Sequence, residues 1–200
     1  MEIIFATGNR HKVTEAQKAL GNSFTLIMPK ELGLTEDIPE NGDTLQANAI
    51  EKAEYLWKRF GKSCFADDTG LEVDALDGAP GVYTARYAGP DKGSDANMEK
   101  LLAELEKAAK EGKCSRKARF RTVVALIIEG ELQIFNGVLE GEIALQRSGS
   151  QGFGYDPVFI PCGYGKTLAE ISLDEKNAIS HRGKAVRALA EYLKCSQKAR

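Results

Sequence analysis

The chain has 200 residues, of which 42% are hydrophobic and 28% charged, and its formal net charge at pH 7 is −2. This size and composition are those of a soluble globular protein with one domain, or one domain with two lobes. A general binder of nucleic acid or of anionic membranes needs an excess of basic residues, so the charge excludes both classes. Four scattered cysteines and two histidines exclude a disulfide framework and a histidine-rich metal centre, but not a hard-cation site made of carboxylates. Without a signal-peptide pattern or an apolar run of membrane-spanning length, we expect a cytoplasmic protein.

Strands and helices alternate in the first third of the chain. We expect a strand over 2–6, a helix over 12–20 and a second strand over 24–28. An acidic loop over 29–42 then leads to a helix over 45–60. Gly21 and Gly61 are expected to end the two helices, and Asp43 or Thr44 to cap the second one.

The rest of the chain adds more strands and two helices. Two short strands are expected over 63–66 and 71–73, and a helix over 94–109. A hairpin follows, with strands over 118–129 and 131–139, and then a glycine-rich segment over 149–156. A buried strand over 157–160 and a C-terminal helix over 184–193 complete the chain. Alternation at the start and an antiparallel hairpin later favour an α/β domain with a mixed sheet.

Two neighbouring acids, Asp67 and Asp68, follow the strand over 63–66. Their mutual repulsion in low-dielectric surroundings is relieved only by a cation or a shared proton. The alternative is that one acid caps a turn while the other is solvated. Glu40 is a third acid, which alone would be an exposed loop residue. Magnesium prefers one or two carboxylates plus phosphate and water, so the three acids together could hold it and leave one to orient or deprotonate water.

Residues 7–12 connect the first strand to the first helix. Backbone N–H groups at a helix start, a glycine at Gly8 and the charge of Lys12 favour an anion there. The second glycine of a phosphate loop or dinucleotide fingerprint is missing, and an ordinary turn with a surface lysine is the alternative.

Two later segments also carry candidate residues. In 152–157, two glycines flank Phe153, which lets the backbone approach a planar ligand while Phe153 or Tyr155 stacks on it; a tight turn with core aromatics is the alternative. Lys176 and the run 180–183 precede the last helix, where cations oppose the helix dipole, which indicates a ligand or a buried partner.

Taken in order, the motifs TGNxxK, PENGxT, xNA, ADDTGL, APGVYTARYAG, GFGYDPVF and EKxAISHRGKA resemble those of the inosine triphosphate pyrophosphatase family, from Phe5 to about Leu193. The resemblance implies an elongated two-lobed mixed β-sheet flanked by helices, with the active-site cleft between the lobes, residues 1–200 forming one nucleotide pyrophosphatase domain. It also implies Mg²⁺-dependent hydrolysis of ITP, dITP and XTP to the monophosphate and pyrophosphate, which keeps these nucleotides out of DNA and RNA. A homodimer is implied as well, with no nucleic acid or membrane partner.

Matching motif positions carry the family's functional residues onto this chain. Asp68 resembles the catalytic proton acceptor and a magnesium ligand, and Glu40 a further metal ligand. The residues that resemble the substrate-binding set are Thr7, Gly8, Asn9, Arg10, His11, Lys12, Thr69, Phe153, Gly154, Tyr155, Asp156, Lys176, His181 and Arg182. Arg10 and His11 occupy variable positions of their motif, so His11 is expected to be a loop residue and not a catalyst.

Selection against ATP requires a donor that reads the oxygen at position 6 of the purine. A hydrogen-bond donor from His181, Arg182 or a backbone N–H would pair with that oxygen. Adenine has a donor amine at position 6 instead, so the protein donor would stay unpaired, which costs about 1–3 kcal/mol. Two other readings remain open: a related pyrophosphatase with another base preference, such as modified pyrimidines, and a non-catalytic nucleotide-binding protein. The latter would be expected to lack the acids.

Overall fold

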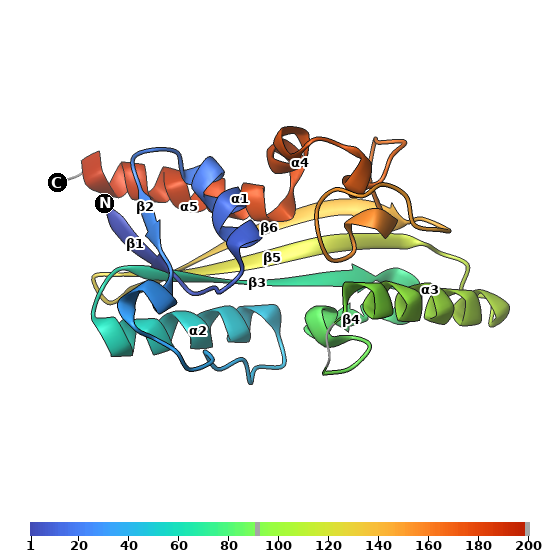
Figure 1. Cartoon of the computed structure of the whole chain (residues 1–200), viewed down its shortest axis with the longest axis horizontal. Helices are drawn as coiled ribbons and strands as arrows, with labels where there is room; N and C mark the ends of the chain where they lie inside the picture. The colour runs from blue at the N-terminus through green and yellow to red at the C-terminus, as the bar shows by residue number, and fades with distance from the viewer. Residues whose placement is uncertain (91–92, 199–200) are drawn as a thin grey trace. The chain divides into compact units, whose positions relative to one another are not determined.

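The computed structural model describes residues 1–90 and 93–198 (Figure 1). Its strands form a mixed sheet in the order β2-β1-β3-β5-β6-β7, with β4 paired to β3. The chain divides into two compact units: unit 1 comprises Met1–Asp68, Thr122–Gly137 and the segment from His181 onward, and unit 2 comprises Thr69–Arg121 and Val138–Ser180. The predicted α/β class with a mixed sheet flanked by helices is confirmed.

Three long strands contribute residues to both units, namely β3 (Cys64–Val73), β5 (Lys117–Ile128) and β6 (Glu131–Ile143). The last two form the predicted hairpin. Each unit has its own hydrophobic core, with Phe5, Phe65 and Leu189 in unit 1 and Leu101, Phe120 and Phe159 in unit 2. No helix in the described part of the chain combines the length and apolar character needed to cross a bilayer.

Unit 1 contains two parallel strand pairs. Its remaining elements are β1 (Glu2–Phe5), α1 (Arg10–Leu20), β2 (Thr25–Ile27), the 3₁₀ turn η1 (Pro29–Leu32), α2 (Leu45–Phe60) and α5 (His181–Lys198). Strand β1 pairs in parallel with β2 and with β3, where Ile4 is opposite Cys64. Helices α1 and α5 cover one side of these strands and α2 the other (Figure 1).

Helix α2 has the boundaries expected from its sequence. The hydroxyl of Thr44 accepts a hydrogen bond from the Ala47 N–H at 3.0 Å, and Gly61 ends the helix in the left-handed region with φ 58°. Its buried stripe contains apolar residues but also Asn48 and Lys52, which are 2% and 3% exposed. These two polar residues face β3, as described below.

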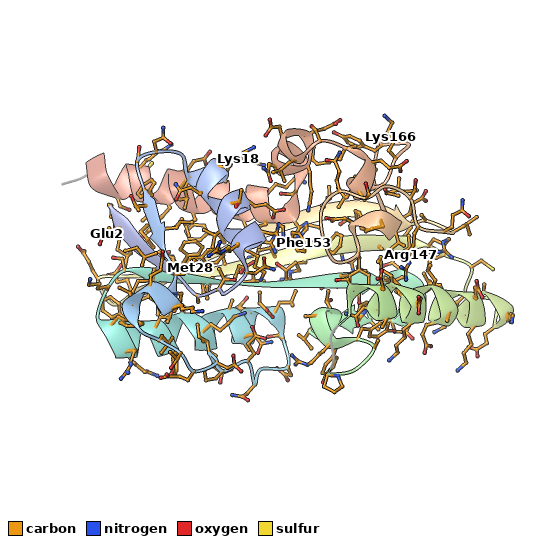
Figure 2. The ribbon with its side chains drawn as sticks, in the orientation of Figure 1. Glu2, Lys18, Met28, Arg147, Phe153 and Lys166 are labelled. Carbon is orange, nitrogen blue, oxygen red and sulfur yellow. The ribbon has the colours of Figure 1, made fainter. Side chains whose placement is uncertain are left out.

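Unit 2 is built on antiparallel pairs, with β4 against β3 and β7 against β6. Its remaining elements are η2 (Asp74–Leu76), β4 (Pro80–Gly81), η3 (Thr84–Arg86), α3 (Ser94–Lys110), η4 (Asp156–Val158), β7 (Phe159–Pro161), η5 (Leu168–Glu170) and α4 (Leu173–Ile179). The side chain of Arg147 ties the loop after β6 to α3 through Asp95 at 2.7 Å (Figure 2).

Three sequence predictions about local structure were wrong. Asp67 and Asp68 do not end a strand but lie inside β3, which continues to Val73. The last helix starts at His181, not after residue 183, and α4 precedes it, capped by the Ser172 hydroxyl. The strand expected over 157–160 is shifted to Phe159–Pro161 because residues 156–158 form a 3₁₀ turn.

The pleat of β3 explains why the strand continues past the two acids. Adjacent acids predict the end of a buried strand if they share one environment, but successive side chains of a strand point to opposite faces. Each carboxylate of β3 therefore meets its own cation on its own face, and the strand does not need to end there.

Candidate active site

Asp67 is the centre of a buried ion-pair network in unit 1. Its Oδ1 accepts a hydrogen bond from Lys12 Nζ at 3.0 Å, and its Oδ2 one from Arg182 Nε at 3.0 Å. The guanidinium of Arg182 also pairs with Glu15 on α1. Burial alone would raise the pKa of the Asp67 carboxyl, but the positive charges of Lys12, Arg182 and Lys52 outweigh burial and hold that pKa well below its usual range. Asp67 is therefore a fixed anion.

Asp68 lies in a different environment, on the α2 face of the strand. Lys52 Nζ donates to Asp68 Oδ1 at 3.1 Å and to Glu40 Oε1 at 2.7 Å, and Asn48 Nδ2 donates to Asp68 Oδ2 at 3.2 Å. Burial raises the pKa of Asp68, Lys52 opposes the rise, and Glu40 adds to it, so that the result is a raised pKa. Neighbouring acids whose pKa values are pushed apart are a common sign of an acid–base pair with separate roles.

The carboxylates of Glu40 and Asp68 both face one positive centre, the ammonium group of Lys52. Their oxygens are the hard ligands that magnesium prefers, and two carboxylates are the usual protein contribution to a site that phosphate and water complete. Among residues 1–90 and 93–198, no group of three or more His, Cys, Asp or Glu side chains could hold a metal ion by itself. The donor set thus fits a magnesium ion shared with a phosphate ligand.

Residues 7–12 form the connection from β1 into α1. Asn9 is the N-cap of α1, and its side chain accepts a hydrogen bond from the His11 N–H at 2.9 Å. The Asn9 N–H in turn donates to the Thr7 hydroxyl at 3.1 Å. Gly8 and the side chains of Arg10 and His11 are exposed. The loop is therefore a capped helix start whose third helical residue, Lys12, reaches Asp67.

His181 and Arg182 open α5 in unit 1 and are 5% and 2% exposed. Gly137 of β6 lets this first turn approach the sheet, because a Cβ there would lie 2.0 Å from the His181 carbonyl oxygen. Arg182, which the sequence predicts to read the purine, belongs to the Asp67 network through its contacts with Asp67 and Glu15.

The remaining predicted residues gather in unit 2. Asp156 Oδ2 accepts hydrogen bonds from Lys176 Nζ at 2.7 Å and from the Phe153 N–H at 2.8 Å, and the Lys176 ammonium lies 4.5 Å from the centre of the Phe153 ring. Phe153 is partly buried and is labelled in Figure 2. A Cβ on Gly152 would lie 2.0 Å from Asp156 Oδ2, so glycine is required where the loop folds over the carboxylate.

The other three residues of this group have distinct environments. Tyr155 is 3% exposed, and its hydroxyl donates to the Thr84 carbonyl at 3.0 Å, so the ring belongs to the core of unit 2. Gly154 has a positive φ of 65°. Thr69 follows Asp68 in β3 and is partly buried.

The structure thus places the predicted residues in two groups. The unit 1 group contains residues 7–12, Glu40, Asp68, His181 and Arg182, and the unit 2 group contains Thr69, residues 153–156 and Lys176. Sequence reasoning missed Glu15, Asn48 and Lys52. The signal was present for the last two, since polar residues at 48 and 52 interrupt the apolar stripe of α2 at a spacing of four, which puts them on one buried face.

Two carboxylates that can share a divalent cation with a phosphate group, together with a strand–loop–helix turn that favours anions, suit an enzyme that acts on phosphoanhydrides. The chain belongs to the Ham1 family, whose model matches residues 3–192. This confirms the resemblance found from the motifs.

Individual relatives match over nearly their full length. The chain is 49% identical over 193 residues to a dITP/XTP pyrophosphatase of Flavobacterium johnsoniae, covering 96% of this chain and 98% of that protein. It is 50% identical over 196 residues to a dITP/XTP pyrophosphatase of Porphyromonas gingivalis, covering 98% and 99%. A solved structure of a HAM1 protein from Coxiella burnetii is 40% identical and superposes with a TM-score of 0.88, covering 97% of this chain and 98% of that one.

Proposed function

We propose that this protein hydrolyses non-standard purine nucleoside triphosphates, namely ITP, dITP and XTP, to the monophosphate and pyrophosphate. Such an enzyme removes these nucleotides from the pool before they enter DNA or RNA. Membership of the Ham1 family and nearly full-length similarity to dITP/XTP pyrophosphatases support this proposal. The observation that carries it is the contrast between the partners of two neighbouring acids: Asp67 accepts hydrogen bonds from Lys12 and Arg182, whereas Asp68 shares the ammonium group of Lys52 with Glu40.

Asp68 is the proposed catalytic base. Burial, with Glu40 adding to it, raises the pKa of Asp68, which makes its carboxylate a stronger base toward water than that of an ordinary aspartate. Lys52 and Asn48 hold its two oxygens, so its orientation is fixed before substrate binds. Asp67 is excluded from this role because its low pKa makes it a weak base.

Glu40 and Asp68 are the residues that would hold magnesium. The ion would neutralise phosphate charge and polarise the attacked phosphoryl group. A triphosphate carries about four negative charges, and the N–H groups of residues 7–12 with the ammonium of Lys12 would neutralise part of them on a protein of nearly zero net charge.

The unit 2 group is proposed to bind the purine. The Phe153 ring supplies a stacking surface, and the Asp156 carboxylate with Lys176 fixes the loop that carries it. Thr69, Gly154 and Tyr155 complete the proposed set. His181 and Arg182 stay predictions as readers of the oxygen at position 6 of the purine.

Residues 1–200 are proposed to act as one functional domain, because the family model extends across both units. The homodimer and the cytoplasmic location stay predictions, for which light scattering of the purified protein and cell fractionation are the measurements.

The test is pyrophosphate release from dITP by the Asp68→Asn variant. Loss of a general base is expected to lower kcat by about 10²- to 10⁴-fold, while the protein still folds. Asp77→Asn is the matched control, since Asp77 is exposed and lies at the end of η2. Undiminished turnover by Asp68→Asn would remove Asp68 from the chemistry.

A panel of triphosphates, with and without magnesium, tests the substrate class and the cation. Hydrolysis of ITP, dITP and XTP in preference to ATP and GTP, and only with the ion, is the expected result. Preference for a modified pyrimidine triphosphate would favour a related pyrophosphatase instead.

A further inference from the structure

One face of α2 contacts the acidic loop over residues 36–42, which carries Glu40. The contacting residues are spaced at three and four positions, which places them in a row along the helix. They are Asn48, Glu51, Lys52 and Tyr55. Lys52 contacts Glu40 itself, whereas the other three contact Glu36, Asn41 and Gly42 of the same loop.

Glu51 makes a bidentate contact with Asn41, the residue that follows Glu40. Its Oε2 accepts a hydrogen bond from the Asn41 backbone N–H at 2.7 Å, and its Oε1 accepts one from the Asn41 side-chain Nδ2 at 2.7 Å. Both the backbone and the side chain of Asn41 are therefore fixed by one carboxylate. Two charge-assisted hydrogen bonds define an orientation, which a single contact does not.

Asn48 continues this attachment toward the active-site strand. Its Oδ1 accepts the Gly42 N–H at 2.7 Å, while its Nδ2 donates to Asp68 Oδ2. Gly42 makes the close approach possible, because a Cβ there would lie 2.6 Å from the Ala47 Cβ. At the other end of the loop, the Tyr55 hydroxyl donates to Glu36 at 3.1 Å. The loop is thus held to α2 both before and after Glu40.

We propose that Glu51 is a positioning residue, which holds Asn41 so that Glu40 is fixed relative to Asp68 and so sets the affinity of the protein for a divalent cation. The inference rests on the proposed magnesium site. The Glu40 side chain is 41% exposed, and Lys52 Nζ lies 2.7 Å from its Oε1. A loop released from α2 must be ordered again when a cation binds, and that entropic cost weakens binding.

The experiment compares Glu51→Ala, Asn41→Ala and the double variant in titrations with Mn²⁺, followed by electron paramagnetic resonance without nucleotide. The matched control is Glu54→Ala, which removes the same charge from the exposed side of the same helix, where Glu54 pairs with Lys58 at 3.2 Å. Each single variant is expected to raise the Mn²⁺ dissociation constant about 5- to 30-fold, as expected for one or two residues that must be ordered again. The double variant should be no weaker than the singles, because both remove the same contact.

Asn41→Ala separates this mechanism from simple electrostatics, because it leaves the net charge unchanged. Amide hydrogen exchange over residues 36–42 supplies a second readout, and it should accelerate in Glu51→Ala but not in Glu54→Ala. Mn²⁺ binding by Glu51→Ala or Asn41→Ala as tight as by the wild type, or additive effects in the double variant, would overturn the inference alone. A wild-type protein that binds no divalent cation would overturn both the inference and the proposed metal site.

Discussion

Replacement of Arg182 by methionine tests whether the buried network of unit 1 works as the distances indicate. Arg182→Met keeps most of the side-chain volume but removes the cation that contacts both Asp67 and Glu15. All three residues are at most 4% exposed. Removal of one partner from a buried ion pair typically costs about 3–5 kcal/mol, and we expect the free energy of unfolding at pH 7 to fall by that amount.

The pH dependence of this loss has a definite sign. Without Arg182, the folded-state pKa of Asp67 should rise from its lowered value, because one of the cations that lower it is gone. The unfolded states of the two proteins titrate alike, so the deficit relative to the wild type should be full at neutral pH and shrink as pH falls through the folded-state pKa of Asp67 in the variant. In the wild type the lowered pKa of Asp67 acts in the opposite sense, since its stabilisation is lost as pH falls below about 4.

Urea unfolding between about pH 2.5 and 8, a range that extends below the ordinary pKa values of carboxyl groups, measures both effects. ITP kinetics at neutral pH with the same proteins report on purine reading. A normal free energy of unfolding together with a large rise in KM for ITP would refute the network reasoning. That outcome would instead support the predicted contact of Arg182 with the base.

Two further substitutions test the packing beside each group. Gly137→Ala should lower the free energy of unfolding by about 1–3 kcal/mol, because its Cβ would meet the His181 carbonyl. Gly165→Ala is the control, because a Cβ there would have nothing within 4 Å, and equal stability of the two variants would contradict the close packing of α5. Tyr155→Phe should lower the free energy of unfolding by about 1 kcal/mol through the lost hydrogen bond to Thr84, with little change in KM for dITP. A large rise in KM would indicate that the hydroxyl contacts the substrate.

Local patterns were sufficient to predict the elements whose signals lie within a few residues. The cap at Thr44, the glycine at 61 and the apolar stripe between them define α2 in any context. Helix α4 was missed because only seven residues form it and its apolar positions are too few to show a period. Its Ser172 cap, with Glu175 three residues later, was the only available signal.

The site was predictable in its residue types but not in its pairing. Asp67 and Arg182 are 115 positions apart in the chain, and no spacing rule connects them. The sequence shows that Asp67 and Asp68 are neighbours. It does not show that their pKa values shift in opposite directions, because those shifts depend on which helix faces each carboxylate. The sequence did not predict the role of Lys52, because a lysine in an amphipathic helix is normally a surface residue, whereas Lys52 is buried and only 3% exposed.

Two chemically identical side chains acquire different properties here only through the pleat of one strand. Because parallel pairing aligns Ile4 with Cys64, Asp67 is turned toward α1 and α5 and Asp68 toward α2. If β3 slipped by one residue, Asp67 would face α2 and Asp68 would face α1 and α5. The carboxylate held ionised and the proposed proton acceptor would then be exchanged, although the sequence would be the same. The alignment of β1 with β3 is therefore as much a determinant of reactivity as any residue at the site.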